Sequence, residues 1–228
     1  MLFKIAVVIP AINEQTNVGE AVQSAIRGGA DEVIVADGGS TDETATMARS
    51  AGARVIRSRL GRGAQMNAAA RESTAEVLLF LHADNRLPTD FAQQIQSAVA
   101  DPRIQAGVFR QRIEGASPLL RLLAWGNEQR VRWKNLAYGD QGIWVRHTIF
   151  EELGGFPEVP LMEDYIFSER LRQQYRFVIL PGPLTVSSRR WQQRGIIGQT
   201  LLNWRIIAAY KQGKSLDELS SLYRRHDH

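Results

Sequence analysis

The sequence predicts an α/β protein with a mainly parallel central sheet flanked by helices, followed by a helical C-terminal segment. Two observations support this fold class. The first half alternates short, apolar, β-branched runs with segments of helical periodicity, joined by short links. From residue 195 onward, large apolar residues recur at helical spacing. Repeated β-α units imply parallel strands with right-handed crossovers, and such sheets bind ligands at the carboxyl ends of their strands.

In the first half, the run at 5–9 is continuously apolar, as expected for a strand that is buried on both faces. The segment 16–27 has apolar residues at helical spacing and ends at Gly28 and Gly29. By the same criteria we expect further strands at 33–36, 54–56 and 77–81, and further helices at 42–50 and 65–72.

The second half is less regular. We expect strands at 106–113, 143–145 and 177–180, and helices at 119–133, 147–153 and 163–174. The sequence has no internal repeat and no flexible linker. We therefore expect one domain over 1–194, divided functionally near residue 100, and a helical extension over 195–228.

Composition excludes several classes of function. The 228 residues include no cysteine, so disulfides, thiolate metal sites and a cysteine nucleophile are ruled out. The net charge of +4 suits phosphate-rich ligands or an anionic membrane, but no basic run interleaved with aromatic residues indicates a nucleic-acid partner. Lys4 interrupts the first apolar run and no cleavage site follows, so we expect a cytoplasmic protein without a signal peptide.

Polar residues follow three of the expected strands, where a hydrophobic core does not need them. They lie in the run that begins with Pro10 and Ala11 and ends with Glu14 after the first strand, in the run from Asp37 to Asp42 after the second, and in the run with His82 and Asp84 after the fourth. A single acidic strand end is often only a helix cap. Because the carboxyl ends of parallel strands share one edge, three such ends together predict a ligand-binding cleft.

Three positions in these segments have a specific chemical reading. Asp37 precedes two glycines and can accept a hydrogen bond from a ribose hydroxyl or a base N–H. Arg62, between two glycines at a helix start, favours an anion, although an ordinary surface arginine is the alternative. His82 and Asp84 point the same way in an extended segment, so both can face one ligand or metal. A Mg²⁺ or Mn²⁺ ion that bridges a diphosphate needs only one or two protein carboxylates. A hydrogen-bonded structural role is the alternative for His82.

Glu163 and Asp164 open the expected helix at 163–174. Acids at a helix start are favoured by the helix dipole, which is the structural explanation. The preceding loop, 154–161, would leave them facing open space, where a carboxylate can take a proton from a hydroxyl.

Taken in order, these segments resemble the family-2 glycosyltransferases of the GT-A fold, in particular a small bacterial subgroup with a Leu-His-Ala-Asp motif. The resemblance extends from residue 7 to about residue 191. It rests on Val-Ile-Pro-Ala-Ile-Asn-Glu at 8–14, Asp-Gly-Gly-Ser-Thr-Asp-Glu-Thr at 37–44, Leu-His-Ala-Asp at 81–84, Gly-Gly-Phe at 154–156 and Glu-Asp at 163–164.

The resemblance implies an inverting, metal-dependent transfer of a sugar from a nucleoside diphosphate sugar, with a UDP-sugar favoured, to an acceptor hydroxyl. Asp164 would be the general base, and the halves 1–100 and 101–194 would bind the donor and the acceptor. Asp84 would hold Mn²⁺ or Mg²⁺, with His82 as a further candidate ligand. The donor would contact Pro10, Ala11, Glu14, Asp37, Arg62 and Asp84.

The sequence departs from the family pattern at three points. His82 stands where the first acid of the Asp-x-Asp motif is usual, and Gly38 where a second acid is usual. The long membrane-spanning helices of polymerising members are missing, which argues against processive synthesis. Two other hypotheses remain. A sugar nucleotidyltransferase would need a glycine-rich loop and a lysine after the first strand, where 11–14 has neither. A protein that binds a nucleotide sugar without turnover is the other.

On the acceptor side we expect Asp140, Gln141, Trp144, Glu163, Arg190 and Trp191. The polar pair 140–141 precedes a short strand near the expected base, and an exposed tryptophan can offer a flat face to a sugar ring. The alternative is that both tryptophans belong to the core.

The apolar segment 196–207 is surrounded by basic residues and predicts weak, peripheral contact with the inner face of a membrane. That contact would suit a lipid-linked acceptor. The alternative is that the same face packs on the catalytic domain or forms a homodimer.

Overall fold

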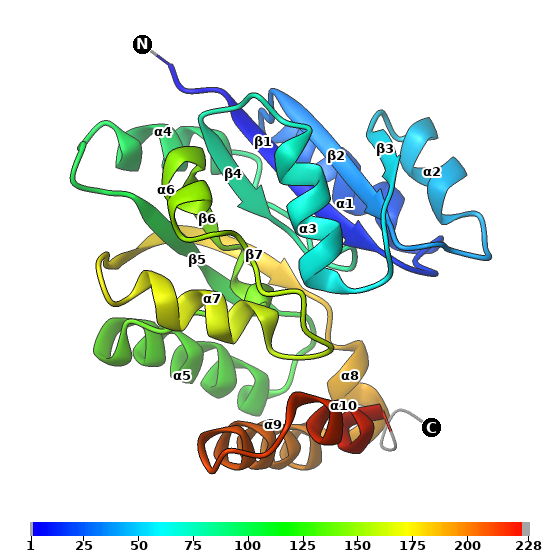
Figure 1. Cartoon of the computed structure of the whole chain (residues 1–228), viewed down its shortest axis with the longest axis vertical. Coiled ribbons are helices and arrows are strands. Elements are labelled where there is room, and N and C mark those ends of the chain that lie inside the picture. The colour runs from blue at the N-terminus through cyan, green and yellow to red at the C-terminus, as the bar shows by residue number, and fades with distance from the viewer. Residues whose placement is uncertain (1, 225–228) are drawn as a thin grey trace.

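The computed structural model describes residues 2–224. Its strands form one seven-stranded sheet in the order β3-β2-β1-β4-β6-β5-β7, with helices on both faces and the C-terminal helices packed together at one end (Figure 1). The strands are β1 Ile5–Ala11, β2 Glu32–Asp37, β3 Arg54–Arg57, β4 Val77–Phe80, β5 Ala106–Ile113, β6 Trp144–Arg146 and β7 Phe177–Val186. The helices are α1 Val18–Arg27, α2 Thr44–Ser50, α3 Arg62–Arg71, α4 Phe91–Val99, α5 Pro118–Lys134, the 3-10 turn η1 Gly139–Gln141, α6 His147–Glu152, α7 Glu163–Leu171, α8 Arg189–Arg194, α9 Ile196–Lys211 and α10 Leu216–Arg224.

The first four strands are parallel, as predicted. β1 lies between β2 and β4, and Val8 is in register with both Ile34 and Phe80. Ala11 at the end of β1 is therefore opposite Asp37 at the end of β2. This register brings the carboxyl ends of the strands, with their polar residues, to one edge of the sheet.

The second half adds an antiparallel strand. β6 runs antiparallel to both β4 and β5, with Leu79 of β4 opposite Trp144 of β6. An antiparallel strand begins where its neighbour ends, so the residues just before β6 lie beside the carboxyl end of β4. Turn η1 thereby reaches the same edge as His82 and Asp84.

Two hydrophobic cores cover the two faces of the sheet. Residues of β1 alternate between them: Val7 and Ile9 pack with α1 and α4, whereas Ala6 and Val8 pack with α3, α6 and α7. This is the period of two that a strand imposes on its side chains. It explains why the strand sequences are apolar throughout.

Several elements differ from the sequence prediction, which included neither η1 nor α8. Helix α4 was not predicted, although its buried residues Phe91, Ile95 and Val99 have helical spacing. Strand β7 continues past residue 180 to Val186, through two prolines. β7 is an edge strand, and proline is tolerated there because one side of the strand makes no ladder bonds.

Helix α9 has two different faces. Leu202 and Ile206 are buried against Leu136, Met162 and Tyr165. The opposite face exposes Ile197, Leu201 and Trp204. Within residues 2–224, no helix is both long enough and apolar enough to span a membrane.

Candidate active site

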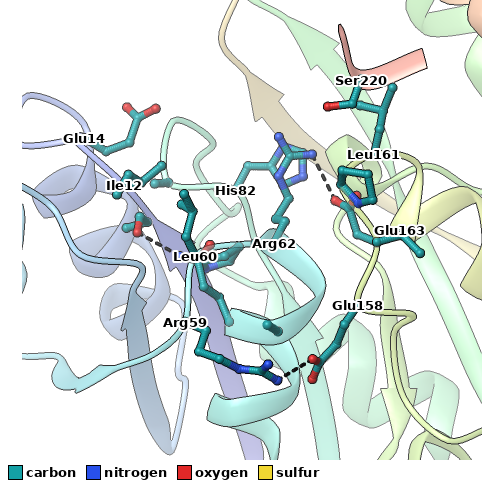
Figure 2. Close-up of a pocket in the computed structure, with 18 of the residues that line it drawn as sticks. Ile12, Glu14, Arg59, Leu60, Arg62, His82, Glu158, Leu161, Glu163 and Ser220 are labelled. Carbon is teal, nitrogen blue, oxygen red and sulfur yellow. Dashed lines mark hydrogen bonds and ion pairs between the residues drawn. The ribbon is translucent and has the colours of Figure 1, made fainter. Parts of the chain in front are cut away.

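A cleft of about 710 Å³ opens at the carboxyl edge of the sheet. Its walls come from the end of β1, the start of α3, the end of β4, the loop before α7, and helices α8 and α10 (Figure 2). Five of the predicted donor residues line it: Pro10, Ala11, Glu14, Arg62 and Asp84.

The floor of the cleft is held by Gln65, which sequence reasoning missed. Its side-chain amide donates to the backbone oxygens of Ala11 and Ala36, both at 2.8 Å, and so ties the ends of β1 and β2 together. Gly38 packs against this amide, and a Cβ at Gly38 would lie 3.1 Å from it. Gly38 stands where the family pattern usually has a second acid. The side chain of Gln65 occupies the space beside it instead.

Asp37 is buried at the end of β2. Its Oδ1 accepts hydrogen bonds from the backbone N–H and the hydroxyl of Ser40. These bonds stabilise the turn that follows β2. A donor contact by Asp37 remains a prediction.

Arg62 and Glu163 join the two sides of the cleft. The Arg62 Nη1 donates to Glu163 Oε1 at 3.1 Å, which links the start of α3 to the start of α7. The Glu163 carboxylate raises the pKa of Arg62. Burial raises the pKa of Glu163, and the neighbouring Asp164 carboxylate adds to this effect while Arg62 opposes it. Glu163 was predicted on the acceptor side. Its side chain is only 4% exposed, and it fixes Arg62.

Arg189 of α8 reaches across the cleft to two predicted donor residues. It donates to the Glu14 carboxylate at 2.8 and 3.2 Å, and its Nη2 lies 3.5 Å from Asp84 Oδ2. The hydrogen bond to Glu14 raises the pKa of Arg189. The carboxylate of Asp84 therefore faces the cleft beside a cation, although no group of three or more His, Asp or Glu residues that could hold a metal occurs in the described part of the chain.

A second, smaller chamber of about 150 Å³ adjoins the cleft, and Arg62 and His82 line both. We call it the side chamber. It is lined by Arg62, His82, Tyr138, Asp140, Leu161, Met162, Asp164, Tyr165, Asn203, Ile206, Ile207 and Tyr223.

The predicted base, Asp164, lies in the side chamber. Its Oδ2 accepts a hydrogen bond of 2.6 Å from the backbone N–H of Gly139, and its Oδ1 accepts one of 2.6 Å from the N–H of Tyr165. A Cβ at Gly139 would lie 2.8 Å from His82 Nε2 and 3.0 Å from Asp164 Oδ2. Both side chains therefore converge on the Cα of Gly139, and the sequence has glycine where no side chain fits.

Arg130 of α5 supports turn η1, and the sequence analysis did not identify it. Its guanidinium lies 3.5 Å from the centre of the Tyr138 ring, and it donates to Gln141 Oε1 at 2.8 Å and to the Leu136 carbonyl at 3.2 Å. Burial lowers the pKa of Arg130, an effect that the nearby Tyr138, Asp140 and Asp164 oppose. Gln141 also accepts from the Tyr138 N–H and is buried, so it belongs to this support and does not face an acceptor.

The two tryptophans were predicted as sugar-stacking residues, and the structure contradicts this for Trp144. Trp144 is completely buried, with its indole packed against Gly107. Trp191 is half-buried and packs against the core beneath the sheet, with its indole nitrogen buried. The side chain of Arg190 lies outside the described residues. Of the acceptor-side predictions, Asp140 is the one whose side chain lines the side chamber.

Comparison with known proteins agrees with this geometry. Residues 6–154 match the model of a family described as glycosyl transferase family 2. Two relatives are the glucosyl-3-phosphoglycerate synthases of Mycolicibacterium smegmatis and Mycolicibacterium paratuberculosis, which are 47% and 34% identical to this chain over 55 and 92 residues. These matches cover 23% and 35% of this chain, and only 18% and 28% of the relatives.

Among solved structures, S. aureus TarS in complex with UDP-GlcNAc has a similar fold, with a TM-score of 0.63 at 18% identity. The similarity covers 81% of this chain and 58% of the TarS chain. The predicted GT-A fold is confirmed. Because the family model matches more than half of its residues, the chain belongs to glycosyl transferase family 2.

Proposed function

We propose that this protein transfers a sugar from a nucleoside diphosphate sugar to an acceptor hydroxyl, with Asp164 as the general base. One observation carries the proposal: a carboxylate lies in a small chamber that shares four lining residues, Arg62, His82, Leu161 and Tyr223, with the large cleft. Donor and acceptor can therefore meet at their junction. Family membership and the likeness to TarS, whose structure holds UDP-GlcNAc, support a UDP-sugar as donor.

In this proposal the nucleotide binds along the carboxyl ends of β1 and β2. Pro10 and Ala11 form the wall beside the nucleobase. Asp37 and Glu14 accept hydrogen bonds from the nucleoside. Arg62 lies at the start of α3, where backbone N–H groups and the helix dipole also favour the diphosphate.

A divalent metal would be held by Asp84. The residues present fit such an ion because Asp84 lines the cleft with a carboxylate, and a hard cation would take its other ligands from the diphosphate and water. Bound there, Mn²⁺ or Mg²⁺ would neutralise charge that develops on the leaving diphosphate. Arg189 would have to leave Asp84 for the ion to bind. We do not assign His82 as a ligand, because its Nε2 and Asp164 Oδ2 both lie close to the position that a Cβ of Gly139 would occupy.

The chemistry then needs one proton acceptor. Asp164 accepts two backbone hydrogen bonds, which fix the direction of its carboxylate and leave lone pairs for an acceptor hydroxyl. As Asp164 removes the proton, the acceptor oxygen attacks the anomeric carbon on the face opposite the diphosphate. A single displacement of this kind inverts the anomeric configuration.

Asp164→Asn tests the assignment of the base. The amide keeps the shape of the side chain but cannot take the proton. We expect UDP affinity within twofold of wild type and a loss of transfer of about 10²- to 10⁴-fold. Transfer that survives within about tenfold, a change of only about 1.4 kcal/mol, would show that another group is the base, with Glu163 as the first candidate.

We further propose that the exposed face of α9 makes the peripheral membrane contact. Ile197, Leu201 and Trp204 form an apolar stripe, and Arg205 and Lys211 are on the same helix. Each basic residue near an anionic leaflet adds about 1 kcal/mol of attraction. Flotation with anionic vesicles at low and at physiological salt tests this: protein that stays at the bottom of the gradient in both would exclude it, and a concentration-dependent mass in sedimentation would indicate a homodimer instead.

A further inference from the structure

We infer that helix α9 is the element that selects the acceptor, and that the acceptor enters the side chamber as a compact, electrically neutral hydroxyl compound with an apolar flank. This inference rests on the proposed transfer reaction and specifies its second substrate.

The position of α9 is the first step. Asn203, Ile206 and Ile207 project from α9 into the same chamber that holds Asp164. These residues lie outside 6–154, the part of the chain that matches the family model. The matched part supplies Arg62, His82, Tyr138 and Asp140 to the side chamber, whereas Asp164 and the wall formed by α9 both come from the part of the chain that follows it.

The wall is also firmly placed. Leu202 and Ile206 of α9 and Leu219 of α10 are buried with Met162 and Tyr165, which flank Asp164 in the sequence. The Asn203 side chain accepts a hydrogen bond of 2.8 Å from Gln199, which leaves its amide N–H groups able to donate. A wall that shares a core with the base is held at a constant distance from it, as selection by shape requires.

Volume limits the part of the acceptor that enters the side chamber. The side chamber of about 150 Å³ is well below the roughly 300–1,000 Å³ of pockets that bury drug-sized ligands. Apolar cavities of about 150 Å³ accommodate a benzene-sized molecule. The part of the acceptor next to Asp164 is therefore on the order of six to ten non-hydrogen atoms.

The side chains that line the side chamber determine which parts of the acceptor can be polar. Leu161, Met162, Ile206 and Ile207 offer no hydrogen bonds, so each hydroxyl buried against them would cost about 1–3 kcal/mol. Hydroxyl groups fit beside Asp164, Asp140 and Asn203. A compound with hydroxyls on one side and an apolar group on the other satisfies both surfaces.

Charge disfavours an anion. Around the side chamber the carboxylates of Asp140, Glu163 and Asp164 outnumber the guanidinium groups of Arg62 and Arg130, and Arg62 is already paired with Glu163 at 3.1 Å. An anionic acceptor would add like charge beside the base. A neutral acceptor avoids this repulsion.

The experiment uses the full chain with Mn²⁺ and radiolabelled UDP-glucose or UDP-GlcNAc. Two acceptor sources are compared: the ultrafiltered small-molecule fraction of a bacterial lysate, and an organic-solvent extract of its lipids. We expect label in a small, water-soluble product that does not bind an anion exchanger.

Two tryptophan variants of α9 form a matched pair. Ile207→Trp should fill the side chamber and lower transfer at least tenfold, with UDP affinity within twofold of wild type. Ala208→Trp adds an indole of the same size to the neighbouring exposed position and should transfer within twofold of wild type.

Each other result has a defined meaning. Label only in lipid, label only in an anionic product, or normal transfer by Ile207→Trp would overturn the inference and leave the proposed function intact. Absence of transfer to either fraction by a protein that binds UDP would count against the proposed function itself. Normal transfer by Asp164→Asn together with loss in Ile207→Trp would keep the inference and move the base elsewhere.

Discussion

The Gly139→Ala substitution adds a single methyl group and tests whether the rate of transfer depends on the positions of His82 and Asp164. The Gly139→Ala side chain would lie 2.8 Å from His82 Nε2 and 3.0 Å from Asp164 Oδ2. Gly139 is not among the glycines with positive φ, so alanine fits the backbone, and only these two side chains must give way. Both contacts are shorter than an ordinary separation of about 3.5–4.0 Å between non-bonded carbon atoms.

The magnitude follows from these distances. Each side chain must move by roughly half an ångström to restore normal contact, and a displacement of about 1 Å can cost 10²-fold in rate. We therefore expect a loss of about 10- to 100-fold in kcat, or about 1.4–2.7 kcal/mol. Stability should stay close to wild type, because alanine restricts the unfolded chain by about 0.4–1 kcal/mol and offsets the strain.

The assay measures UDP release in the presence of acceptor, together with thermal unfolding and UDP binding. Gly126→Ala is the control: a Cβ there meets no atom within 4 Å, and the site is inside helix α5. That variant should gain about 0.5–1 kcal/mol and keep wild-type kcat. The reasoning is refuted if Gly139→Ala keeps kcat within twofold, or if it loses UDP affinity as much as it loses rate.

Three further predictions concern charged residues that line the cleft or support the side chamber. Asp84→Asn should abolish the Mn²⁺-dependent part of UDP affinity in calorimetric titrations, and an unchanged Mn²⁺ effect would remove Asp84 as the ligand. Burial raises the pKa of Glu163, so between pH 4.5 and that raised value the folded state holds a proton that the unfolded state has lost, and wild-type stability falls as pH rises. The stability of Glu163→Gln relative to wild type should therefore increase with pH above 4.5 in urea titrations, and a relative stability that decreases would contradict the shift. Arg130→Met removes charged hydrogen bonds beneath the Tyr138–Gln141 turn and should cost about 1–3 kcal/mol of stability. It should also lower kcat without changing UDP affinity, whereas a purely structural role would leave the kcat of the folded fraction unchanged.

Much of the fold could be predicted because its physical cause is local. A strand buried on both faces reads as an apolar run, which is how β1 and β4 were recognised. Helix α4 was missed because its three buried residues, Phe91, Ile95 and Val99, are separated by polar ones that resemble a loop. The end of β7 was missed because two prolines hide an edge strand.

More of the predicted residues lie in the cleft than in the side chamber, where Asp140 and Asp164 are found. Glu14, Arg62 and Asp84 were identified because the carboxyl ends of parallel strands must share an edge. On the acceptor side, the type of a residue did not predict whether its side chain faces the site. Gln141 is polar but buried, since Arg130 and the Tyr138 backbone satisfy its amide oxygen. Trp144 is a large aromatic residue whose place in the core depends on Gly107, 37 positions earlier.

The sequence by itself determined the alternation of strands and helices, the edge of the sheet where the cleft lies and the family of the chain. Each follows from neighbouring residues or from the order of short motifs. The tertiary structure alone decided that His82, Gly139 and Asp164 meet, and that α9 closes the chamber around them. These contacts depend on the antiparallel register of β6 and on the core shared by α7, α9 and α10. Both join residues far apart in the chain, and no local pattern encodes such a distance.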